Sequence, residues 1–471
     1  MDARLGVVRS AAARAAPVAL DDLGDWLRIP SVSGDPARAD DLERAARWVV
    51  DRLRRDGATV RSLRTAAGPV VVARTRGRGR GTTVVYGHLD VKPPGPGWTT
   101  PAFRPTRVGH RLQARGTSDD KGQVMAHLAA LRAWVRAGGP PGDVITIVDG
   151  TEEIGSPGLL PLLTGVRHDL TAGPVVGVLV IDTRMAGPGR PTLTLTQRGA
   201  VPVRLSVDVG GRPVHAGRLG GAVVDPSLVL ADLLGRAARD LAALPTPGPP
   251  YPAEPTAAAV RAAAAGRAVH PGVVRRATRS GVLTVTRLHA GAAAGAVPTR
   301  AEALLDVRVP PGTDPAAVLP GLTRDLRRAL PPGVRLTVAA GSGEAGSVLA
   351  PPARVRAALD DACRAAFGRP TTSAASGGSI RAVDVLRRVF GQTPALLGLG
   401  PADDGAHGPD EYLDLREWPA QVDVHVLTLA RLAVLGTPQQ GQRFGTFTSA
   451  TVARPVASWG PGYAQEISGV T

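Results

Sequence analysis

Four short apolar runs are each followed by a histidine or an acidic side chain, and this feature limits the possible folds more than any other. The runs and the residues that follow them are 82–86 before His88, 144–148 before Glu153, 175–181 before Asp182, and 394–400 before His407. Short, continuously apolar runs are typical of strands buried on both faces of a parallel sheet. In an open α/β sheet, residues beyond the carboxyl ends of such strands gather at one edge.

Segments with helical periodicity alternate with these runs. Leu42, Ala46, Val49 and Leu53 recur at the spacing of one helix face, and a second such segment covers residues 124–135. This alternation predicts an α/β catalytic domain in which helices cover a mixed, mostly parallel sheet.

The pattern changes after about residue 196. Val201, Val203, Leu205 and Val207 alternate with other residues, which predicts a strand with one solvated face. The segments that follow predict a helix, two strands, a helix and a strand, at 226–241, 282–288, 303–309, 315–330 and 334–338. The order β-α-β-β-α-β is that of a ferredoxin-like domain, which we expect to be an insertion.

We therefore divide the chain into four parts. They are a first part of the catalytic domain at 1–196, an inserted domain at 197–343, a second catalytic part at 344–436 and a C-terminal tail at 437–471. The tail is rich in Gly, Gln, Thr and Ser with little periodicity, so we expect it to be flexible. The Pro/Ala/Gly-rich stretch 245–272 is expected to be a loop with one short helix.

The net charge of +16 does not predict nucleic-acid binding. Lysine occurs only at Lys92 and Lys121, and the arginines are scattered along the chain. No aromatic residues that could stack on bases interleave with the densest arginine cluster, at 74–80. We expect no nucleic-acid partner.

Neither a membrane partner nor export is expected. No run approaches the roughly 18 apolar residues of a membrane span. Arg14 and Pro17 interrupt the apolar stretch near the N-terminus, so a secretory signal is not predicted. Cys363, the single cysteine, cannot form an internal disulfide, which is consistent with a reducing compartment. We expect a cytoplasmic protein.

Two histidines and three carboxylates are candidate ligands of a metal site. They are His88, Asp119, Glu153, Asp182 and His407. Imidazole and carboxylate ligands suit zinc, and one carboxylate can bridge two ions about 3.5–4 Å apart. Taken singly, each has an ordinary alternative, such as a surface ion pair, a helix cap or a turn residue. Their joint placement at strand ends favours the metal site.

Two further acidic residues have predicted roles beside these ligands. Asp90 lies two residues after His88, so its side chain can accept the far N–H of the imidazole and fix its tautomer. Glu152 and Glu153 are adjacent, so only one can easily face the metals. The other is free to take a proton from metal-bound water.

At these residues the sequence resembles the zinc metallopeptidases that include carnosine dipeptidase, the cysteinylglycine dipeptidases, acetylornithine deacetylase and succinyl-diaminopimelate desuccinylase. The dipeptidase branch is the most similar. The matching stretches are YGHLDVKPPGPGW (86–98), RGTSDDKGQVMAHLAAL (115–131), DGTEEIGSPGL (149–159), VHAGRLGG (214–221), LLDVRVPPG (304–312), SGGSI (376–380) and GLGPADDGAHGPDEYLDL (398–415). The similarity runs from about residue 20 to 435.

The resemblance implies a role for each candidate ligand. His88 and Asp182 would bind one zinc ion, Glu153 and His407 the other, and Asp119 would bridge the two. Asp90 would support His88, and Glu152 would be the general base. Manganese or cobalt could replace zinc, because the ligand types do not exclude them.

The resemblance also assigns roles to the inserted domain. It would be a lid and the dimerisation domain of a homodimer. His215 would stabilise the oxyanion, in related enzymes from the partner subunit. Arg308 would bind the terminal carboxylate of the substrate, helped by Gly378 and Ser379.

These implications lead to one preferred function and one alternative. The preferred function is hydrolysis of dipeptides or short peptides, and the alternative is deacylation of N-acyl amino acids at the same di-zinc site. Thr183 and the segment 408–412 depart from the dipeptidase pattern, which concerns substrate preference more than the metal ligands. A non-enzymatic binding protein is not favoured, because every ligand and the base are intact.

Overall fold

The computed structural model describes residues 2–171, 173–246, 260, 267–291 and 294–434. The chain divides into two compact units. The first contains residues 1–191, 351–371 and 382–471, and the second contains 192–350 and 372–381. The insertion predicted at 197–343 lies within the second unit. The predicted tail and most of the loop 245–272 lie outside the described residues.

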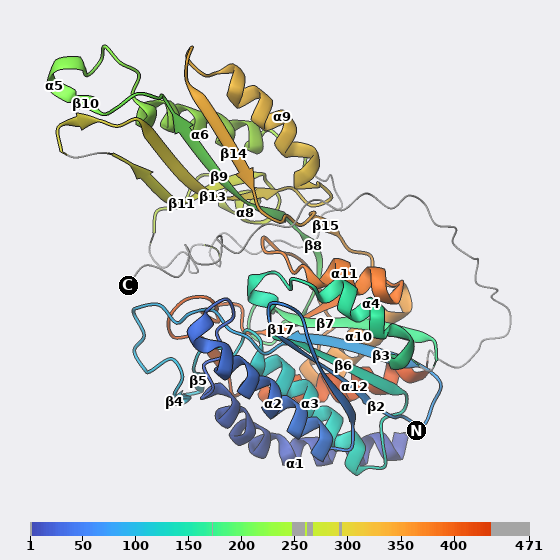
Figure 1. Ribbon diagram of the computed structural model, residues 1–471. Coiled ribbons are helices and arrows are strands. Elements are labelled where there is room, and N and C mark those ends of the chain that lie inside the picture. The colour runs from blue at the N-terminus through green and yellow to red at the C-terminus, as the bar shows by residue number, and fades with distance from the viewer. Residues whose placement is uncertain (1, 172, 247–259, 261–266, 292–293, 435–471) are drawn as a thin grey trace. The chain divides into compact units, whose positions relative to one another are not determined.

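The first unit is built on a mixed sheet (Figure 1). Its strands are β1 (Thr59–Arg64), β2 (Pro69–Thr75), β3 (Thr82–His88), β6 (Asp143–Asp149), β7 (Val175–Arg184) and β17 (Ala395–Gly400), in the order β1-β2-β6-β3-β7-β17. The pairs β6–β3, β3–β7 and β7–β17 are parallel, and β1–β2 and β2–β6 are antiparallel. Every residue of β3 and β17 is buried, as their continuous apolar runs predict.

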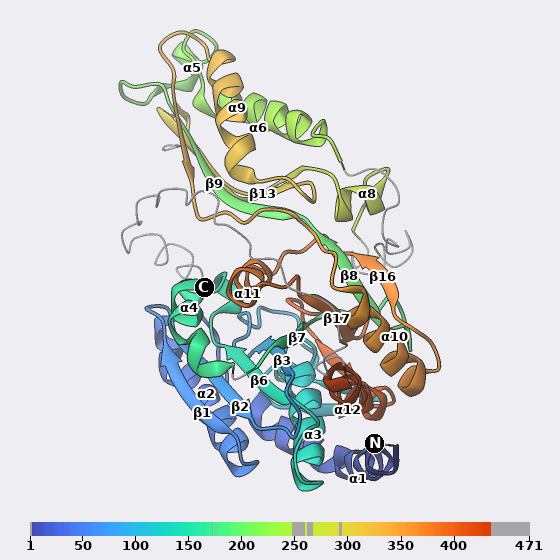
Figure 2. The same ribbon diagram turned by 90° about the vertical axis from the view of Figure 1, so that its right-hand side faces the viewer.

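Helices cover both faces of this sheet (Figures 1 and 2). On one face lie α1 (Asp2–Leu27), α3 (Lys121–Arg136), α10 (Ala353–Phe367) and α12 (Trp418–Val434). On the other lie α4 (Leu159–Leu170) and α11 (Ala382–Phe390), and α2 (Ala39–Arg55) packs on β1 and β2. The helical spacing of Leu42, Val49 and Leu53 is explained, since these side chains form the buried face of α2.

Short elements complete the first unit. They are η1 (Pro36–Arg38), η2 (Glu152–Ile154), and the three-stranded sheet of β4 (Thr106–Val108), β5 (Arg111–Gln113) and β18 (Tyr412–Asp414). Cys363 lies in α10, where burial raises the pKa of its thiol to about 12. The thiol therefore serves packing rather than reactivity.

The second unit contains the predicted ferredoxin-like domain. Its elements are β9 (Gly199–Asp208), α6 (Pro226–Ala242), β11 (Val282–Ala290), β13 (Arg300–Val309), α9 (Pro315–Arg328) and β14 (Arg335–Ala340). The strands form an antiparallel sheet in the order β11-β13-β9-β14, which confirms the βαββαβ prediction. Alternate residues of β9, from Val201 to Val207, form its core together with side chains of α6 and α9.

Smaller elements surround this domain. They are β8 (Thr192–Gln197), β10 (Val214–His215), α5 (Ala216–Leu219), α8 (Val273–Thr278), β12 (Ala296–Val297), β15 (Ser347–Val348) and β16 (Thr372–Ala375). Strand β8 pairs with β15 and β16, and β10 pairs with β12. Among the helices of the described residues, none combines the length and the apolar character needed to cross a membrane.

Candidate metal centre

The predicted ligands come from the carboxyl ends of neighbouring strands. His88 is the last residue of β3, Asp182 lies near the end of β7, and Glu153 lies in η2 shortly after β6. Because β3, β6 and β7 are parallel, these ends share one edge of the sheet. Asp119 precedes α3, and His407 lies in the loop after β17. Residues far apart in the chain thus meet at this edge.

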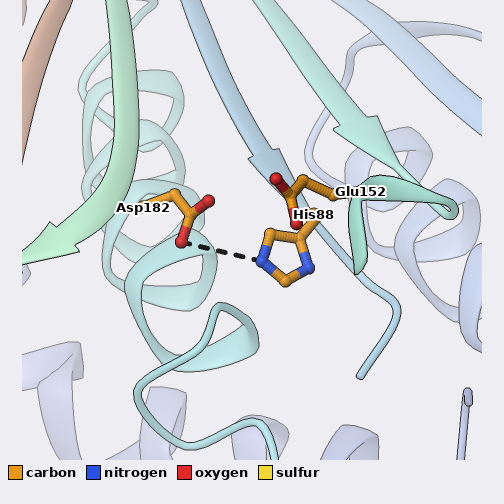
Figure 3. Close-up of side chains that lie close together, drawn as sticks. All are labelled: His88, Glu152 and Asp182. Atoms are coloured by element: carbon orange, nitrogen blue, oxygen red, sulfur yellow. Dashed lines mark ion pairs between the residues drawn. The ribbon is translucent and has the colours of Figure 1, made fainter. Parts of the chain in front are cut away.

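Two of these side chains form an inner group with Glu152, the predicted general base. It consists of His88, Glu152 and Asp182, whose candidate ligand atoms all lie within 4.8 Å of one another (Figure 3). The Nε2 atom of His88 is 3.7 Å from Oδ1 of Asp182, and the His88 side chain is fully buried. The group contains one buried imidazole and two half-buried carboxylates.

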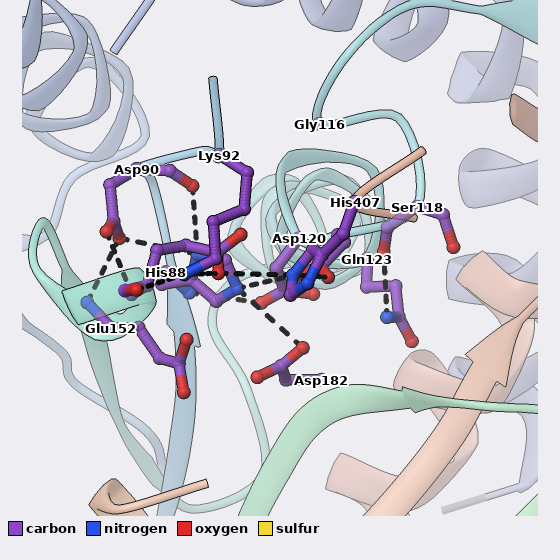
Figure 4. Close-up of polar contacts among 12 residues, drawn as sticks. His88, Asp90, Lys92, Gly116, Ser118, Asp120, Gln123, Glu152, Asp182 and His407 are labelled. Atoms are coloured by element: carbon purple, nitrogen blue, oxygen red, sulfur yellow. Dashed lines mark hydrogen bonds and ion pairs between the residues drawn. The ribbon is translucent and has the colours of Figure 1, made fainter. Parts of the chain in front are cut away.

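A second, outer group consists of Asp119, Glu153 and His407, again with ligand atoms within 4.8 Å of one another. The Nε2 atom of His407 is 3.1 Å from Oδ2 of Asp119 and 3.2 Å from Oε2 of Glu153. The other oxygen of Asp119, Oδ1, is 3.0 Å from Nε2 of His88. Figure 4 shows the His88 side chain between those of Asp90 and Asp182. One carboxylate thus faces both groups, as a bridging ligand must.

Asp90 orients both His88 and the η2 turn. The Nδ1 atom of His88 lies 3.0 Å from the backbone oxygen of Asp90, which can only accept, so Nδ1 carries the proton and Nε2 is left to face the carboxylates. The Asp90 carboxylate accepts the backbone N–H groups of Glu152 and Glu153 at 3.2 and 3.0 Å. We predicted that this carboxylate would hold the imidazole. The backbone oxygen is nearer, since Oδ1 lies 3.4 Å away.

Electrostatics show an excess of negative charge in the two groups. Burial, followed by the charge of Asp182, raises the pKa of Glu152 well above its usual range. Burial also raises the pKa of Asp182 to about 6. For His407 burial opposes the charged form, but hydrogen bonds to Asp119 and Glu153 outweigh it and raise the pKa to about 10. Two imidazoles and several carboxylates thus lie close together and carry excess negative charge. Divalent cations are suited to such a set of ligands, because they neutralise this negative charge.

Glu411 is a supporting residue that we did not single out from the sequence. Its fully buried carboxylate accepts the backbone N–H groups of Gly116, Ser118 and Asp119 at 3.0, 2.9 and 3.0 Å. It also pairs with Arg115, 2.7 Å away. Burial raises its pKa to about 7, although Arg115 opposes that shift. In the sequence, the only indication of this supporting role was the presence of an acidic residue in the segment 408–412.

Gly87 and Asp120 form a second support. The Asp120 carboxylate accepts the backbone N–H of His88 at 3.0 Å. A Cβ atom on Gly87 would lie 2.5 Å from Asp120 Oδ2 and 2.5 Å from a methyl group of Val124. A glycine before His88 is therefore required for β3 to approach the start of α3 this closely.

The second unit brings together part of the predicted substrate-binding set. Arg308 donates to Asp306 through Nε and Nη2, both at 3.0 Å, and to Oγ of Ser379 through Nη1 at 3.2 Å. Ser379 in turn donates to Glu344, and the N–H of its neighbour Gly378 donates to Ser376 at 3.1 Å.

His215 lies on a different element of the second unit, the short strand β10. It is exposed, and its Nδ1 atom accepts the N–H of Gly217 at 3.1 Å, which caps α5. The sequence did not predict two contacts of the Arg308 and Ser379 side chains. Arg308 pairs with Asp306, and Ser379 donates to Glu344.

The sequence pattern of Peptidase family M20/M25/M40 matches residues 84–431, so the chain belongs to this family of metal-dependent peptidases. The cysteinylglycine-S-conjugate dipeptidase of Corynebacterium striatum is 30% identical over 217 residues, 45% of this chain and 47% of the relative. The Beta-Ala-His dipeptidase of Homo sapiens is 30% identical over 230 residues, 45% of each chain. These matches therefore span about half the length of the relatives.

A solved structure supports the same fold. The dipeptidase Dug1p from Saccharomyces cerevisiae superposes with a TM-score of 0.77 at 20% identity, covering 91% of this chain and 98% of that chain. At this identity the likeness establishes the fold alone. Together with the family match it confirms the predicted α/β architecture. The two dipeptidase relatives confirm the resemblance to the dipeptidase branch.

Proposed function

We propose that the chain hydrolyses dipeptides or other short peptides at a site for two zinc ions. The observation that carries this proposal is the position of Asp119, whose two carboxylate oxygens face His88 and His407 separately. His88 and Asp182 would hold one ion, Glu153 and His407 the other, with Asp119 shared. When bound, such ions polarise a carbonyl and lower the pKa of water. Manganese or cobalt would fit the same ligands.

Glu152 is proposed as the general base. It belongs to the inner group by position, yet it is not required as a ligand if Asp119 bridges. Its carboxylate lies beside the proposed ligands His88 and Asp182, where it could take a proton from the attacking water and deliver that proton to the leaving amine. The Asp90 carboxylate, which accepts the N–H of Glu152, fixes the turn that presents this side chain.

The second unit would supply substrate recognition. We propose that Arg308 binds the terminal carboxylate, with Ser379 and Gly378 beside it. Because Nε and Nη2 of Arg308 already donate to Asp306, the carboxylate would be bound through Nη1 and the Ser379 hydroxyl. Assembly as a homodimer through the inserted domain, with His215 stabilising the oxyanion, is proposed from the family resemblance alone. A cytoplasmic location stays a prediction.

The alternative is deacylation of N-acyl amino acids by the same residues. The relatives named above are dipeptidases, which favours peptides. Parallel assays with Cys-Gly, β-Ala-His and N-acetyl amino acids would separate the two functions. Turnover of the N-acetyl compounds alone would select the alternative.

The test of the base is the Glu152→Ala variant. We expect kcat to fall by about 10²- to 10⁴-fold, because the proton acceptor is lost, while the zinc content stays unchanged. Asp40→Ala, which removes an exposed carboxylate from the first turn of α2, is the matched control and should leave both values unchanged. Near-normal turnover of Glu152→Ala would reject the assignment.

A further inference from the structure

A lysine contacts one of the proposed zinc ligands. The Nζ atom of Lys92 lies 3.1 Å from Oε2 of Glu153, and it also donates to the backbone oxygen of Glu153. The same Oε2 atom is the one that lies 3.2 Å from Nε2 of His407. A single oxygen thus faces both the ammonium group and the imidazole of the outer group.

This arrangement creates a competition. Oε2 is the Glu153 oxygen near His407, so a cation held between these two side chains would lie close to the ammonium group, which repels it. The Glu153 side chain is only 5% exposed, so solvent screens this repulsion weakly. The Lys92 side chain is 34% exposed, and its flexible four-carbon stem allows the ammonium group to move toward solvent.

The inner group is built differently. The His88 side chain is fully buried, and the Asp90 backbone oxygen holds its Nδ1 atom so that Nε2 faces Asp119 and Asp182. In the outer group, the His407 side chain is 52% exposed. A buried, oriented imidazole binds a cation more tightly than an exposed one whose carboxylate neighbour is already paired.

We propose that the Lys92 ammonium group competes with the outer cation for the Glu153 carboxylate; this proposal rests on the proposed function. In the metal-free protein Lys92 neutralises Glu153, and it releases this carboxylate when a cation binds to the Asp119, Glu153 and His407 group. The outer group therefore binds its cation more weakly than the inner group and loses it first. Lys92 sets the difference between the two affinities and thereby the metal concentration at which the centre is complete.

Zinc titration by equilibrium dialysis tests this proposal on the full metal-stripped chain. The wild type should bind two equivalents with different affinities. Lys92→Gln should tighten the weaker one by about 10-fold and leave the stronger one unchanged. Lys92→Arg keeps the positive charge and should retain the wild-type difference.

The matched control is Arg184→Gln. Arg184 donates to Asp404 and feels the charge of Asp119, so its replacement also removes a positive charge near the centre. It should not reduce the difference between the two affinities. An equal tightening in Arg184→Gln, or an unchanged weaker affinity in Lys92→Gln, would overturn the role of Lys92. Absence of zinc binding in the wild type would overturn the proposed function as well.

Amine acetylation of the wild type gives a second readout. Lys92 and Lys121 are the only lysines of the chain, and Lys121 is fully buried. Mass spectrometry can therefore follow Lys92, with Lys121 as an internal reference. Excess zinc should raise the acetylation rate of Lys92 several-fold, because the ammonium group is released from Glu153. A rate that zinc leaves unchanged or lowers would contradict the proposal.

Discussion

The metal centre of the first unit and the Arg308 cluster of the second unit differ in how completely their side chains are fixed. In the metal centre, imidazole nitrogens already face carboxylates, and buried groups such as Asp90 and Glu411 hold the surrounding backbone. In the second unit, Arg308 is partly exposed and paired with Asp306, so binding a substrate carboxylate there requires an exchange of partners. The first arrangement suits chemistry, which needs fixed geometry, and the second suits recognition, which tolerates adjustment.

We expect Glu411→Gln in the first unit to reduce zinc affinity and the free energy of unfolding more than the other changes discussed below. The change leaves the buried Arg115 without its counter-charge and disturbs the backbone that carries Asp119. We expect zinc affinity to fall by about 10- to 100-fold and the free energy of unfolding to fall by about 3 kcal/mol. Zinc dialysis and urea unfolding would measure both.

The control for this prediction comes from the second unit. Glu302 pairs with Arg204 and Arg300 at 3.2 and 3.0 Å on the surface of the ferredoxin-like sheet. Glu302→Gln should cost less than about 1 kcal/mol and leave zinc affinity unchanged, because ion pairs that solvent can reach contribute little. Equal losses in the two variants would remove the distinction between a fixed centre and an adjustable surface.

An intermediate effect is expected for Arg308→Lys. The charge remains, but a lysine cannot donate to Asp306 and a substrate carboxylate in the same planar geometry. We expect KM to rise by about tenfold, which corresponds to one charge-assisted hydrogen bond, with zinc content unchanged. Asp306→Asn weakens the competing pair and should lower KM or leave it as in the wild type. An unchanged KM in Arg308→Lys would show that this cluster does not bind the carboxylate.

The same contrast explains which parts of the site could be predicted from the sequence. Continuous apolar runs identify buried parallel strands, and parallel strands bring their carboxyl ends to one edge, so His88, Glu153 and Asp182 could be placed together. The alternation along β9 likewise predicted the ferredoxin-like sheet. In both cases local periodicity determines which side chains are buried.

Contacts that depend on the path of a loop could not be predicted. Glu411 is far in sequence from Asp119, and no periodicity indicates that its carboxylate turns inward to accept three backbone N–H groups. The pairing of Lys92 with Glu153 depends on two loops, each following a different strand. The partner of Arg308 depends on its side-chain conformation, since Asp306 lies on the same face of the same strand.

The last prediction concerns stability against acid, where the histidines of the two units differ in burial. His127 of α3 and His425 of α12 are buried with ring centroids 5.5 Å apart. Burial lowers the pKa of His425 to about 4, and burial together with His425 lowers the pKa of His127 well below its usual range. The described histidines of the second unit, His215, His270 and His289, are exposed.

At these two histidines the unfolded chain therefore binds more protons than the folded first unit does, since a free histidine has a pKa of about 6.5. The stability contributed by neutral His425 is fully present above that pH and is lost as pH falls toward about 4, which amounts to about 3 kcal/mol. Nε2 of His425 has no hydrogen-bond partner among the described residues, so His425→Leu breaks no hydrogen bond at this atom and should remove part of this pH dependence. Hydrogen exchange followed by peptide at pH 6.5 and 4.5 should show that this fall in pH stabilises the first unit less, or weakens it more, in the wild type than in His425→Leu, while the second unit responds alike in both proteins. The same acid response of the first unit in the wild type and in His425→Leu would contradict the role of His425.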